Sequence, residues 1–214
     1  MKMDEDVEYL NIDNETEEAP VEETSGKKSK KPKKKRTLGQ EILINSIYLL
    51  VVFLLALFIV KFVGQRTVVN GRSMEPTLQD GDNLIVDKLT YRFSDPKRFD
   101  IIVFPYRYGK NEFYIKRIIG LPGERVRIDA SGSIYINGER LEENYGKEVI
   151  ENPGDVFNEI TLGDDEYFVL GDNRNNSSDS RLQYDVGNIK RKDIIGKAWL
   201  RVYPFNKFGF VKHR

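Results

Sequence analysis

One serine lies in an unusual local context, in the stretch VVNGRSMEPTL at residues 68–78. Gly71, two residues before Ser73, gives the backbone access to angles that other residues avoid, and Pro76 disfavours the continuation of a helix. A serine on such a tight turn exposes its hydroxyl and its backbone N–H together, which is what a nucleophile with an oxyanion donor needs. An ordinary loop serine is the alternative interpretation of this stretch alone.

A serine nucleophile needs a base, and the single histidine, His213, is discounted because it lies next to the last residue. A lysine acts as a base only when neutral, which requires burial among apolar groups to lower its pKa from about 10.4. Lys116 in EFYIKRIIG fits best, because Tyr114 and Ile118 flank it on its own face of an extended strand. The alternative is a lysine that points to water. Arg117 would face the other way, so that one of the two points inward.

Residues 170–181, LGDNRNNSSDSR, form a third stretch that could do chemistry. This polar loop directly follows the apolar stretch EYFV, so its start is set by a predicted strand. Loops held by a rigid scaffold are where catalytic and supporting groups collect. Asp179 and Arg181 can pair, and a serine of this loop could orient a lysine amine. A merely polar loop is the alternative.

The part of the chain that must position these three stretches is predicted to be rich in β-strands. Short runs of β-branched and aromatic residues alternate with turn signals such as LPGE at 121–124 and Asn137-Gly138. No amphipathic helix of three turns stands out. The predicted strands cover residues 83–89, 100–106, 112–121, 125–128, 133–138, 166–170 and 197–205.

A continuous apolar segment without any charge, Ile42–Val60, precedes the β-rich part. Its 19 residues, at about 1.5 Å each in a helix, come close to the ~30 Å thickness of a bilayer core. The segment is too long for the apolar part of a signal peptide and no Ala-x-Ala follows it, so we predict an uncleaved anchor. The basic block before it, Lys27–Arg36, predicts a cytoplasmic N-terminus and an extracytoplasmic β-rich domain. Anionic lipid headgroups are a sufficient partner for those lysines.

The domain organisation follows from these segments. Residues 1–41 are predicted to be a disordered cytoplasmic tail, residues 42–63 the transmembrane anchor, and residues 64–214 the extracytoplasmic domain. The chain holds 34 basic and 34 acidic residues, and the part beyond the anchor is close to neutral, so no nucleic-acid partner is predicted. Without cysteine, and with a single histidine, no disulfide, thiolate chemistry, metal site or other cofactor is predicted. Composition does not determine the oligomeric state.

Together, NGRSMEPTL, YIKRIIGLPGE and GDNRNNSSDSR, in this order after one anchor, resemble the motifs of bacterial type I signal peptidases. The short domain resembles the Gram-positive type, and the resemblance covers about residues 40 to 210. It implies a mostly β fold of the signal-peptidase type. It also implies a membrane-bound serine endopeptidase that removes signal peptides from exported preproteins by cutting after Ala-x-Ala-like sites.

The resemblance also implies roles by position. Ser73 falls on the nucleophile, with its backbone N–H as oxyanion donor, Lys116 on the general base, and Ser177 on the serine that orients the lysine. The supporting positions of the polar loop are Asp172, Asp179 and Arg181. The residues implied to line shallow apolar substrate pockets are Met74, Leu78, Leu84, Tyr114 and Ile115.

Two positions depart from the family's pattern. Many Gram-negative members have a serine that adds a hydroxyl to the oxyanion hole where this chain has Gly71, so the Ser73 N–H is expected to carry more of that role. The family often shows Arg-Gly-Asp before an apolar strand, whereas this chain has Arg98-Phe99-Asp100. Phe99 is expected to alter the local turn without touching the residues assigned to catalysis.

Two other functions are alternatives. A self-cleaving repressor with a Ser-Lys dyad would need a helix-turn-helix in place of the tail and anchor, and the basic block lacks the length and apolar pattern for one. A membrane-anchored β domain that binds without catalysis requires Lys116 to point outward or the polar loop to be disordered. The C-terminal aromatic residues Phe205, Phe208 and Phe210 are expected to close the core or, alternatively, to contact the bilayer.

Overall fold

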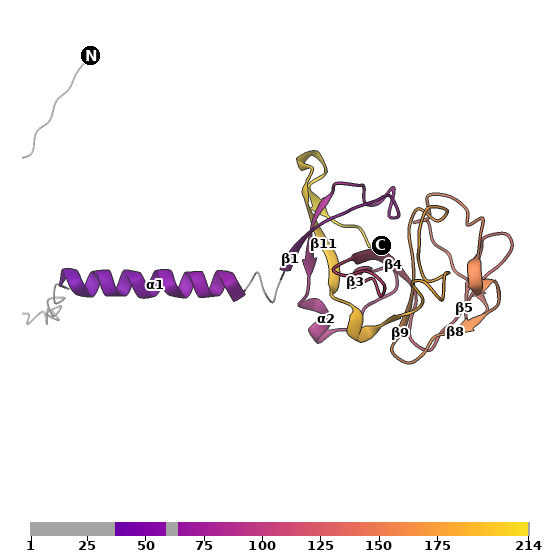
Figure 1. Cartoon of the computed structure of the whole chain (residues 1–214), viewed down its shortest axis with the longest axis horizontal. Helices are drawn as coiled ribbons and strands as arrows, with labels where there is room; N and C mark the ends of the chain where they lie inside the picture. The colour runs from indigo at the N-terminus through magenta and orange to yellow at the C-terminus, as the bar shows by residue number, and fades with distance from the viewer. Residues whose placement is uncertain (1–36, 59–63, 214) are drawn as a thin grey trace, which may run out of the picture. The chain divides into compact units, whose positions relative to one another are not determined.

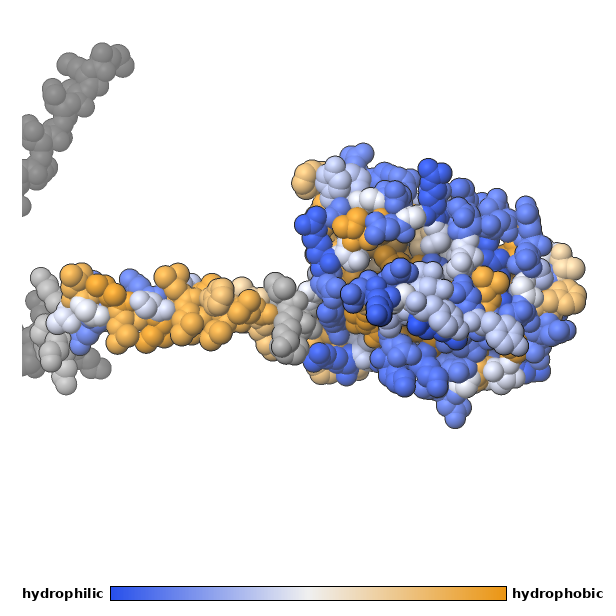
Figure 2. Space-filling model, viewed as in Figure 1, coloured by the Kyte–Doolittle hydropathy of each residue, from blue (hydrophilic) through white to orange (hydrophobic). Residues whose placement is uncertain are grey.

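The computed structural model describes residues 37–58 and 64–213. The apolar segment forms helix α1, Leu38–Phe58, which begins before the predicted start at Ile42 and is long and apolar enough to cross a membrane. Figure 2 shows hydrophobic residues over most of its visible surface. The predicted tail with its basic block, residues 1–36, and the last part of the predicted anchor, residues 59–63, lie outside the described residues.

An antiparallel sheet of eight strands carries the three stretches singled out from the sequence. Its order is β1-β2-β11-β3-β4-β9-β10, with β12 paired to β11, and β3, β4 and β9 lie side by side in Figure 1. The C-terminal strand β11 therefore lies between two strands from the first half of the domain. The bounds are β1 Gly64–Val68, β2 Asn83–Asp87, β3 Ile101–Pro105, β4 Phe113–Gly120, β9 Glu166–Leu170, β10 Ile189–Lys190, β11 Gly196–Tyr203 and β12 Gly209–Phe210.

A second, smaller sheet follows β4 in the chain, with the order β7-β6-β5-β8. Its strands are β5 Arg125–Ile128, β6 Ile134–Ile136, β7 Glu139–Arg140 and β8 Ile160–Thr161. The predicted turn at Asn137 and Gly138 joins β6 to β7, and both residues have positive φ angles, 54° and 86°. Such angles define the two-residue hairpin turn for which Asn-Gly is the preferred pair.

Helical structure beyond α1 is short in the described part of the chain, as predicted. It consists of α2 Thr90–Phe93 and the 3₁₀ turns η2 Gly154–Phe157, η3 Arg191–Asp193 and η4 Phe205–Lys207. All seven predicted strands are present, and the domain is mostly β. The strands that the sequence did not reveal are β1, β7, β8, β10 and β12. Four of them are only two residues long and too short to show a period, and β1 has a largely exposed polar sequence.

Strand β4 contributes to all three hydrophobic clusters of the domain. Ile119 packs in a cluster with the small sheet, Ile118 in a cluster with β3 and β9, and Ile115 against a cluster beneath the loop that carries Ser73. Full burial, as of Ile118 and Ile119, stabilises the fold by about 1.5–3 kcal/mol for each side chain. The strand that carries Lys116 is therefore held on both of its faces.

The expectation that the C-terminal aromatic residues close the core is wrong. Phe205, Phe208 and Phe210 are 80%, 63% and 70% exposed, and Val211 is the buried residue of this segment. The segment contributes its backbone instead, since the Val211 N–H donates to the Trp199 carbonyl beside β12.

Candidate active site

Ser73 lies in the loop between β1 and β2. Gly71 adopts φ +93°, in the left-handed region, as the position of a glycine before the serine led us to expect. Its N–H donates to Asp80 Oδ1 at 2.7 Å, which fixes the turn. Ser73 is partly exposed, and its backbone N–H has no acceptor among residues 37–58 and 64–213. The hydroxyl and the N–H are therefore both available to a substrate carbonyl.

Lys116 points inward from β4 and is only 4% exposed, so the alternative of a lysine directed at water is wrong. Its Nζ lies 2.9 Å from Ser73 Oγ and donates to the Ile115 carbonyl at 3.1 Å. The Tyr114 ring centroid lies 4.9 Å from the same nitrogen. Sequence alternation correctly placed Tyr114 beside the lysine on one face of the strand.

Burial lowers the pKa of Lys116 from 10.5 to about 8. The carboxylates of Asp179 and Asp172 oppose this change in pKa, because they attract the ammonium form. Removal from water is the stronger of the two effects. About a tenth of the amines would then be neutral at pH 7, whereas an ordinary lysine would be almost fully protonated.

Arg117, the neighbour of Lys116, is also fully buried, so the fold covers both of these side chains and not just one. Its Nε and Nη2 donate to the two carboxylate oxygens of Asp172 at 2.8 and 2.7 Å, and its guanidinium lies 3.8 Å from the Tyr145 ring centroid. A bidentate pair of this kind fixes both partners. Sequence reasoning assigned no role to Arg117, although the apolar residues on both sides of β4 were a signal that neither face meets water.

Phe99 supports this arginine from the neighbouring turn. It adopts φ +72°, the left-handed region that favours glycine, and its carbonyl accepts a hydrogen bond from Arg117 Nη1 at 2.9 Å. Phe99 therefore has no hydrogen bond to the residues assigned to catalysis, but it holds Arg117, the partner of Asp172. A bulky residue at such an angle is uncommon, because its Cβ crowds the backbone.

The Ser73 loop and the polar loop are joined by three hydrogen bonds. The Asn173 N–H donates to the Ser73 carbonyl at 3.0 Å, and its side-chain amide donates to the Arg72 carbonyl at 3.0 Å. Thr77 Oγ1 donates to Asp172 Oδ2 at 2.5 Å. Sequence reasoning missed Asn173 and Thr77, because these bonds cross about a hundred residues of chain.

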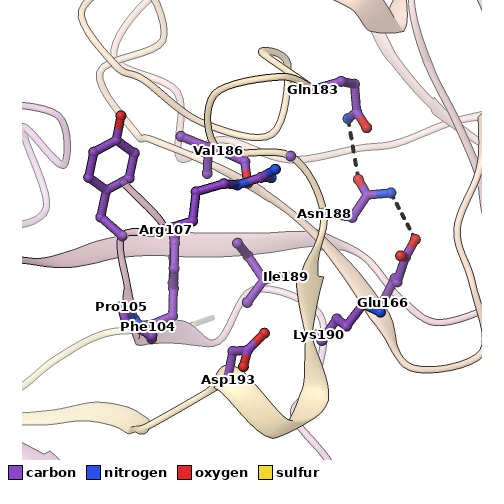
Figure 3. Close-up of a pocket in the computed structure, with 12 residues that line it drawn as sticks. Phe104, Pro105, Arg107, Glu166, Gln183, Val186, Asn188, Ile189, Lys190 and Asp193 are labelled. Carbon is purple, nitrogen blue, oxygen red and sulfur yellow. Dashed lines mark hydrogen bonds between the residues drawn. The ribbon is translucent and has the colours of Figure 1, made fainter. Parts of the chain in front are cut away.

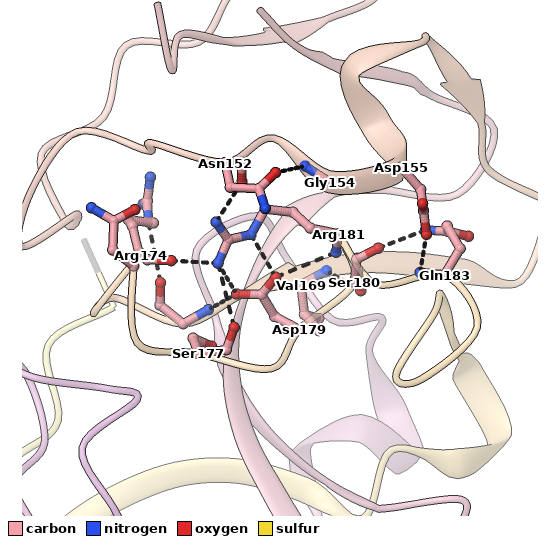
Figure 4. A network of polar contacts seen from close by, with 12 residues as sticks. Asn152, Gly154, Asp155, Val169, Arg174, Ser177, Asp179, Ser180, Arg181 and Gln183 are labelled. Carbon is pink, nitrogen blue, oxygen red and sulfur yellow. Dashed lines mark hydrogen bonds and ion pairs between the residues drawn. The ribbon is translucent and has the colours of Figure 1, made fainter. Parts of the chain in front are cut away.

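The predicted pairing of Asp179 with Arg181 is confirmed and organises the end of the polar loop (Figure 4). Arg181 Nε and Nη2 donate to the two carboxylate oxygens at 2.8 and 3.0 Å, and Nη1 donates to the Asn152 carbonyl at 3.0 Å. Asp179 also accepts from the Gly171 N–H at 3.1 Å. The loop is thus bonded at both ends, contrary to the alternative in which it is disordered.

Ser177 lies beside Gly171, where the polar loop also meets the Ser73 carbonyl. Its hydroxyl is buried and has no hydrogen-bond partner among the described residues. A Cβ added at Gly171 would lie 2.2 Å from this hydroxyl and 2.5 Å from the Ser73 carbonyl oxygen. Glycine therefore makes room for the two serine segments to meet. That Ser177 orients the lysine remains a prediction.

The residues implied to line substrate pockets differ in their exposure. Met74, Leu78 and Leu84 are buried in the cluster beneath the Ser73 loop, whereas Tyr114 and Ile115 are partly exposed beside Lys116. Their role as pocket lining remains a prediction. The cavity of about 360 Å³ shown in Figure 3 lies elsewhere, near Arg107 and Asn188.

His213 is bound into the fold although it lies next to the last residue. Its Nδ1 accepts from the Ile101 N–H at 3.0 Å, and burial lowers the pKa of the imidazole to about 4. It has no hydrogen bond to Ser73 or Lys116 in the described structure. The only histidine of the chain therefore does not serve Ser73 as a base.

Known signal peptidases are similar to this chain over most of its length. Residues 42–203 match the family model described as signal peptidase, peptidase S26. The chain is 38% identical to the probable signal peptidase I-2 of Synechocystis sp., over 89% of this chain and 84% of that one. It is 37% identical to signal peptidase I of Bacillus amyloliquefaciens, over 86% of this chain and 100% of that one.

A crystal structure of a signal peptidase I from Enterococcus faecalis is 35% identical, with a TM-score of 0.40, and covers 49% of this chain and 97% of that one. The family match and the two relatives establish that the chain belongs to the signal peptidase family, peptidase S26. It is accordingly a membrane-bound serine endopeptidase.

Proposed function

We propose that Ser73 and Lys116 form the catalytic dyad with which this chain removes signal peptides from exported preproteins, cutting after Ala-x-Ala-like sites. The observation that carries the proposal is the 2.9 Å separation of Lys116 Nζ and Ser73 Oγ, with the lysine 4% exposed and its pKa lowered to about 8. A base with a pKa near the working pH combines a sizeable neutral fraction with useful basicity.

The chemistry follows from this geometry in two stages. Neutral Lys116 takes the hydroxyl proton while Ser73 Oγ attacks the scissile carbonyl, and the Ser73 N–H stabilises the oxyanion. Lys116 then gives the proton to the leaving amine as the C–N bond breaks, which leaves an acyl-enzyme. In the second stage Lys116 takes a proton from water, the water attacks the ester, and the proton returns to Ser73 as the signal peptide leaves.

The polar loop supplies the support for this dyad in our proposal. Ser177, whose hydroxyl has no partner among the described residues, would accept a hydrogen bond from the lysine amine during the reaction and so direct the lone pair at Ser73. Asp172, held by Arg117, fixes the Ser73 loop through Thr77. Asp179 and Arg181 hold the segment that carries Ser177.

The membrane arrangement is also a proposal. Helix α1 anchors the chain, with the basic block on the cytoplasmic side and the β domain outside.

The exposed rings of Phe208 and Phe210 favour contact of the hairpin formed by β11 and β12 with the bilayer. Trp199, the only tryptophan, lies 5.5 Å from the Phe210 ring and can report this contact. Brominated lipid chains should quench its fluorescence in vesicles, and less so after Phe208→Ser with Phe210→Ser; no quenching of the wild type would contradict the proposal.

The test of the dyad is processing of a preprotein with an Ala-x-Ala site in detergent micelles. Folded Ser73→Ala and Lys116→Ala should lose cleavage, while Ser177→Ala should retain slow cleavage. Cleavage that survives Ser73→Ala would place the nucleophile elsewhere. Equal loss in Ser177→Ala and Lys116→Ala would contradict the supporting role of Ser177.

A further inference from the structure

The Tyr114 ring beside Lys116 is held between two other aromatic rings. Phe104 is its direct partner across β3 and β4, and the two rings meet edge to face at 6.2 Å. Tyr106 lies two residues beyond Phe104, so it is the diagonal neighbour of Tyr114 on the same face. The rings of Tyr106 and Tyr114 are stacked at 4.6 Å with an interplanar angle of 5°.

Tyr106 is in turn anchored to a distant segment. Its hydroxyl donates to Asp185 Oδ1 at 2.6 Å, and this bond raises the pKa of Tyr106 to about 12, so the phenol remains a donor at working pH. Two more bonds join the same hairpin tip to the segment 182–187, one from the Tyr108 hydroxyl to the Tyr184 carbonyl and one from Arg107 to the Val186 carbonyl. Figure 3 shows Arg107 reaching toward Val186.

The groups around Lys116 determine what Tyr114 does there. The Ser73 hydroxyl faces Nζ from the Ser73 loop, and the carboxylates of Asp172 and Asp179 act on it from the polar loop. The Tyr114 ring occupies a remaining side, 4.9 Å from Nζ. A ring face attracts an ammonium by about 0.5–2 kcal/mol, but water solvates the charged amine far more strongly. Displacement of the ring by water would therefore favour the charged form.

We propose that Tyr106 is a positioning residue for the lysine base: stacked on Tyr114 and anchored by Asp185, it holds the Tyr114 ring against Lys116 and keeps water from Nζ. This inference rests on the proposed dyad. Asp185, which anchors Tyr106, lies in the segment that directly follows the polar loop, so neighbouring segments of chain support both sides of Lys116. Tyr106 touches neither Lys116 nor Ser73 by any described contact, so it acts only through Tyr114.

The experiment measures kcat/KM against pH, from pH 6 to 10.5, for the full chain in micelles with a preprotein peptide. Tyr106→Leu should move the rise in kcat/KM to higher pH, and activity at pH 7 should fall about tenfold for each pH unit by which the midpoint moves. The kcat/KM values of Tyr106→Leu and the wild type should approach each other toward pH 10.5, because the lysine is then largely neutral in both proteins. Tyr106→Phe keeps the stacked ring but loses the hydroxyl bonded to Asp185, so its profile should move in the same direction as that of Tyr106→Leu, but less far.

Tyr184→Leu is the matched control, since its side chain is 88% exposed and its carbonyl, the acceptor for Tyr108, is kept. Its profile should match the wild type. If Tyr106→Leu does not fold, Asp185→Ala provides the second test. Loss of the Tyr106–Asp185 bond should move the kcat/KM profile to higher pH, because the Tyr114 ring is no longer held against Lys116. Loss of the Asp185 negative charge alone would move the profile to lower pH, because a carboxylate favours the charged lysine.

Three outcomes would overturn the inference: an unchanged profile in Tyr106→Leu, a loss by the same factor at every pH, or a profile that moves to lower pH in Asp185→Ala. Failure of the proposed dyad would be recognised separately. In that case folded Ser73→Ala or Lys116→Ala would still cleave the peptide, whatever the profiles of the Tyr106 variants.

Discussion

Replacement of Lys116 by methionine should abolish cleavage and yet stabilise the folded protein. The ammonium group is 4% exposed and has lost most of its water, which is why its pKa falls from 10.5 to about 8. Below pH 8 the lysine is charged in both the folded and the unfolded protein, so the folded state carries the full cost of the buried charge. Between pH 8 and 10.5 the unfolded state binds more protons, and stability rises with pH.

The size of the effect follows from the two pKa values. At about 1.4 kcal/mol for each tenfold change in the acid constant, the difference between 10.5 and about 8 corresponds to about 3 kcal/mol at pH 7. Methionine fills a similar volume without a charge and removes this cost. The lost hydrogen bonds to Ser73 and Ile115 subtract about 0.5–1.5 kcal/mol each. The net gain in the free energy of unfolding should therefore be between about 0 and 2 kcal/mol at pH 7.

The assay is denaturant unfolding in micelles at pH 7 and pH 10.5, for the wild type, Lys116→Met and the control Lys192→Met. Lys192 is exposed, so its substitution should change stability little at either pH. The stability of Lys116→Met relative to the wild type should fall by about 2–3 kcal/mol between pH 7 and 10.5, where the wild-type amine is neutral in the folded protein and about half neutral in the unfolded chain. A relative stability that does not change with pH would refute the reasoning, because it would mean that the folded protein carries no buried-charge cost.

Three further expectations concern the same site. In wild type, kcat/KM should rise between pH 6 and 9 with a midpoint near 8, because deprotonation of Lys116 creates the base; a flat profile would contradict a lysine base. Asp172→Ala should lower the free energy of unfolding by about 3–5 kcal/mol, since Arg117 would remain buried without its partner, and a loss below about 1 kcal/mol in thermal unfolding would argue against this. Gly171→Ala should reduce kcat/KM about a hundredfold by pushing the two serine segments apart, whereas Gly163→Ala, whose Cβ would meet only a flexible glutamate side chain at 3.3 Å, should not.

Much of this fold and site could be predicted because the signals were local. Alternation along β4 placed Tyr114 beside Lys116, and the apolar run correctly predicted helix α1. Gly71 correctly indicated a left-handed backbone conformation two residues before Ser73. In each case the cause lies within a few residues, as backbone sterics, strand periodicity or the length of an apolar helix.

The errors came where packing on both sides of an element overrides a local pattern. Alternation indicated that one of Lys116 and Arg117 has to face inward, but gave no sign that β4 is covered on both faces and buries both. The C-terminal aromatic residues looked like core by composition, whereas their rings are mostly exposed and Val211 is the buried side chain of the segment.

The sequence by itself determined which residues could do chemistry in this protein, the membrane-spanning length of its apolar segment and the β-rich character of its domain. The tertiary structure alone decided that Lys116 meets Ser73 across 43 positions of chain, that Asn173 and Thr77 join two loops, and that Tyr106 reaches Asp185 across 79 positions. The physical reason is that burial and hydrogen bonding depend on neighbours brought together by sheet pairing. The pKa of Lys116, on which the proposed chemistry depends, is a property of those neighbours rather than of the residue.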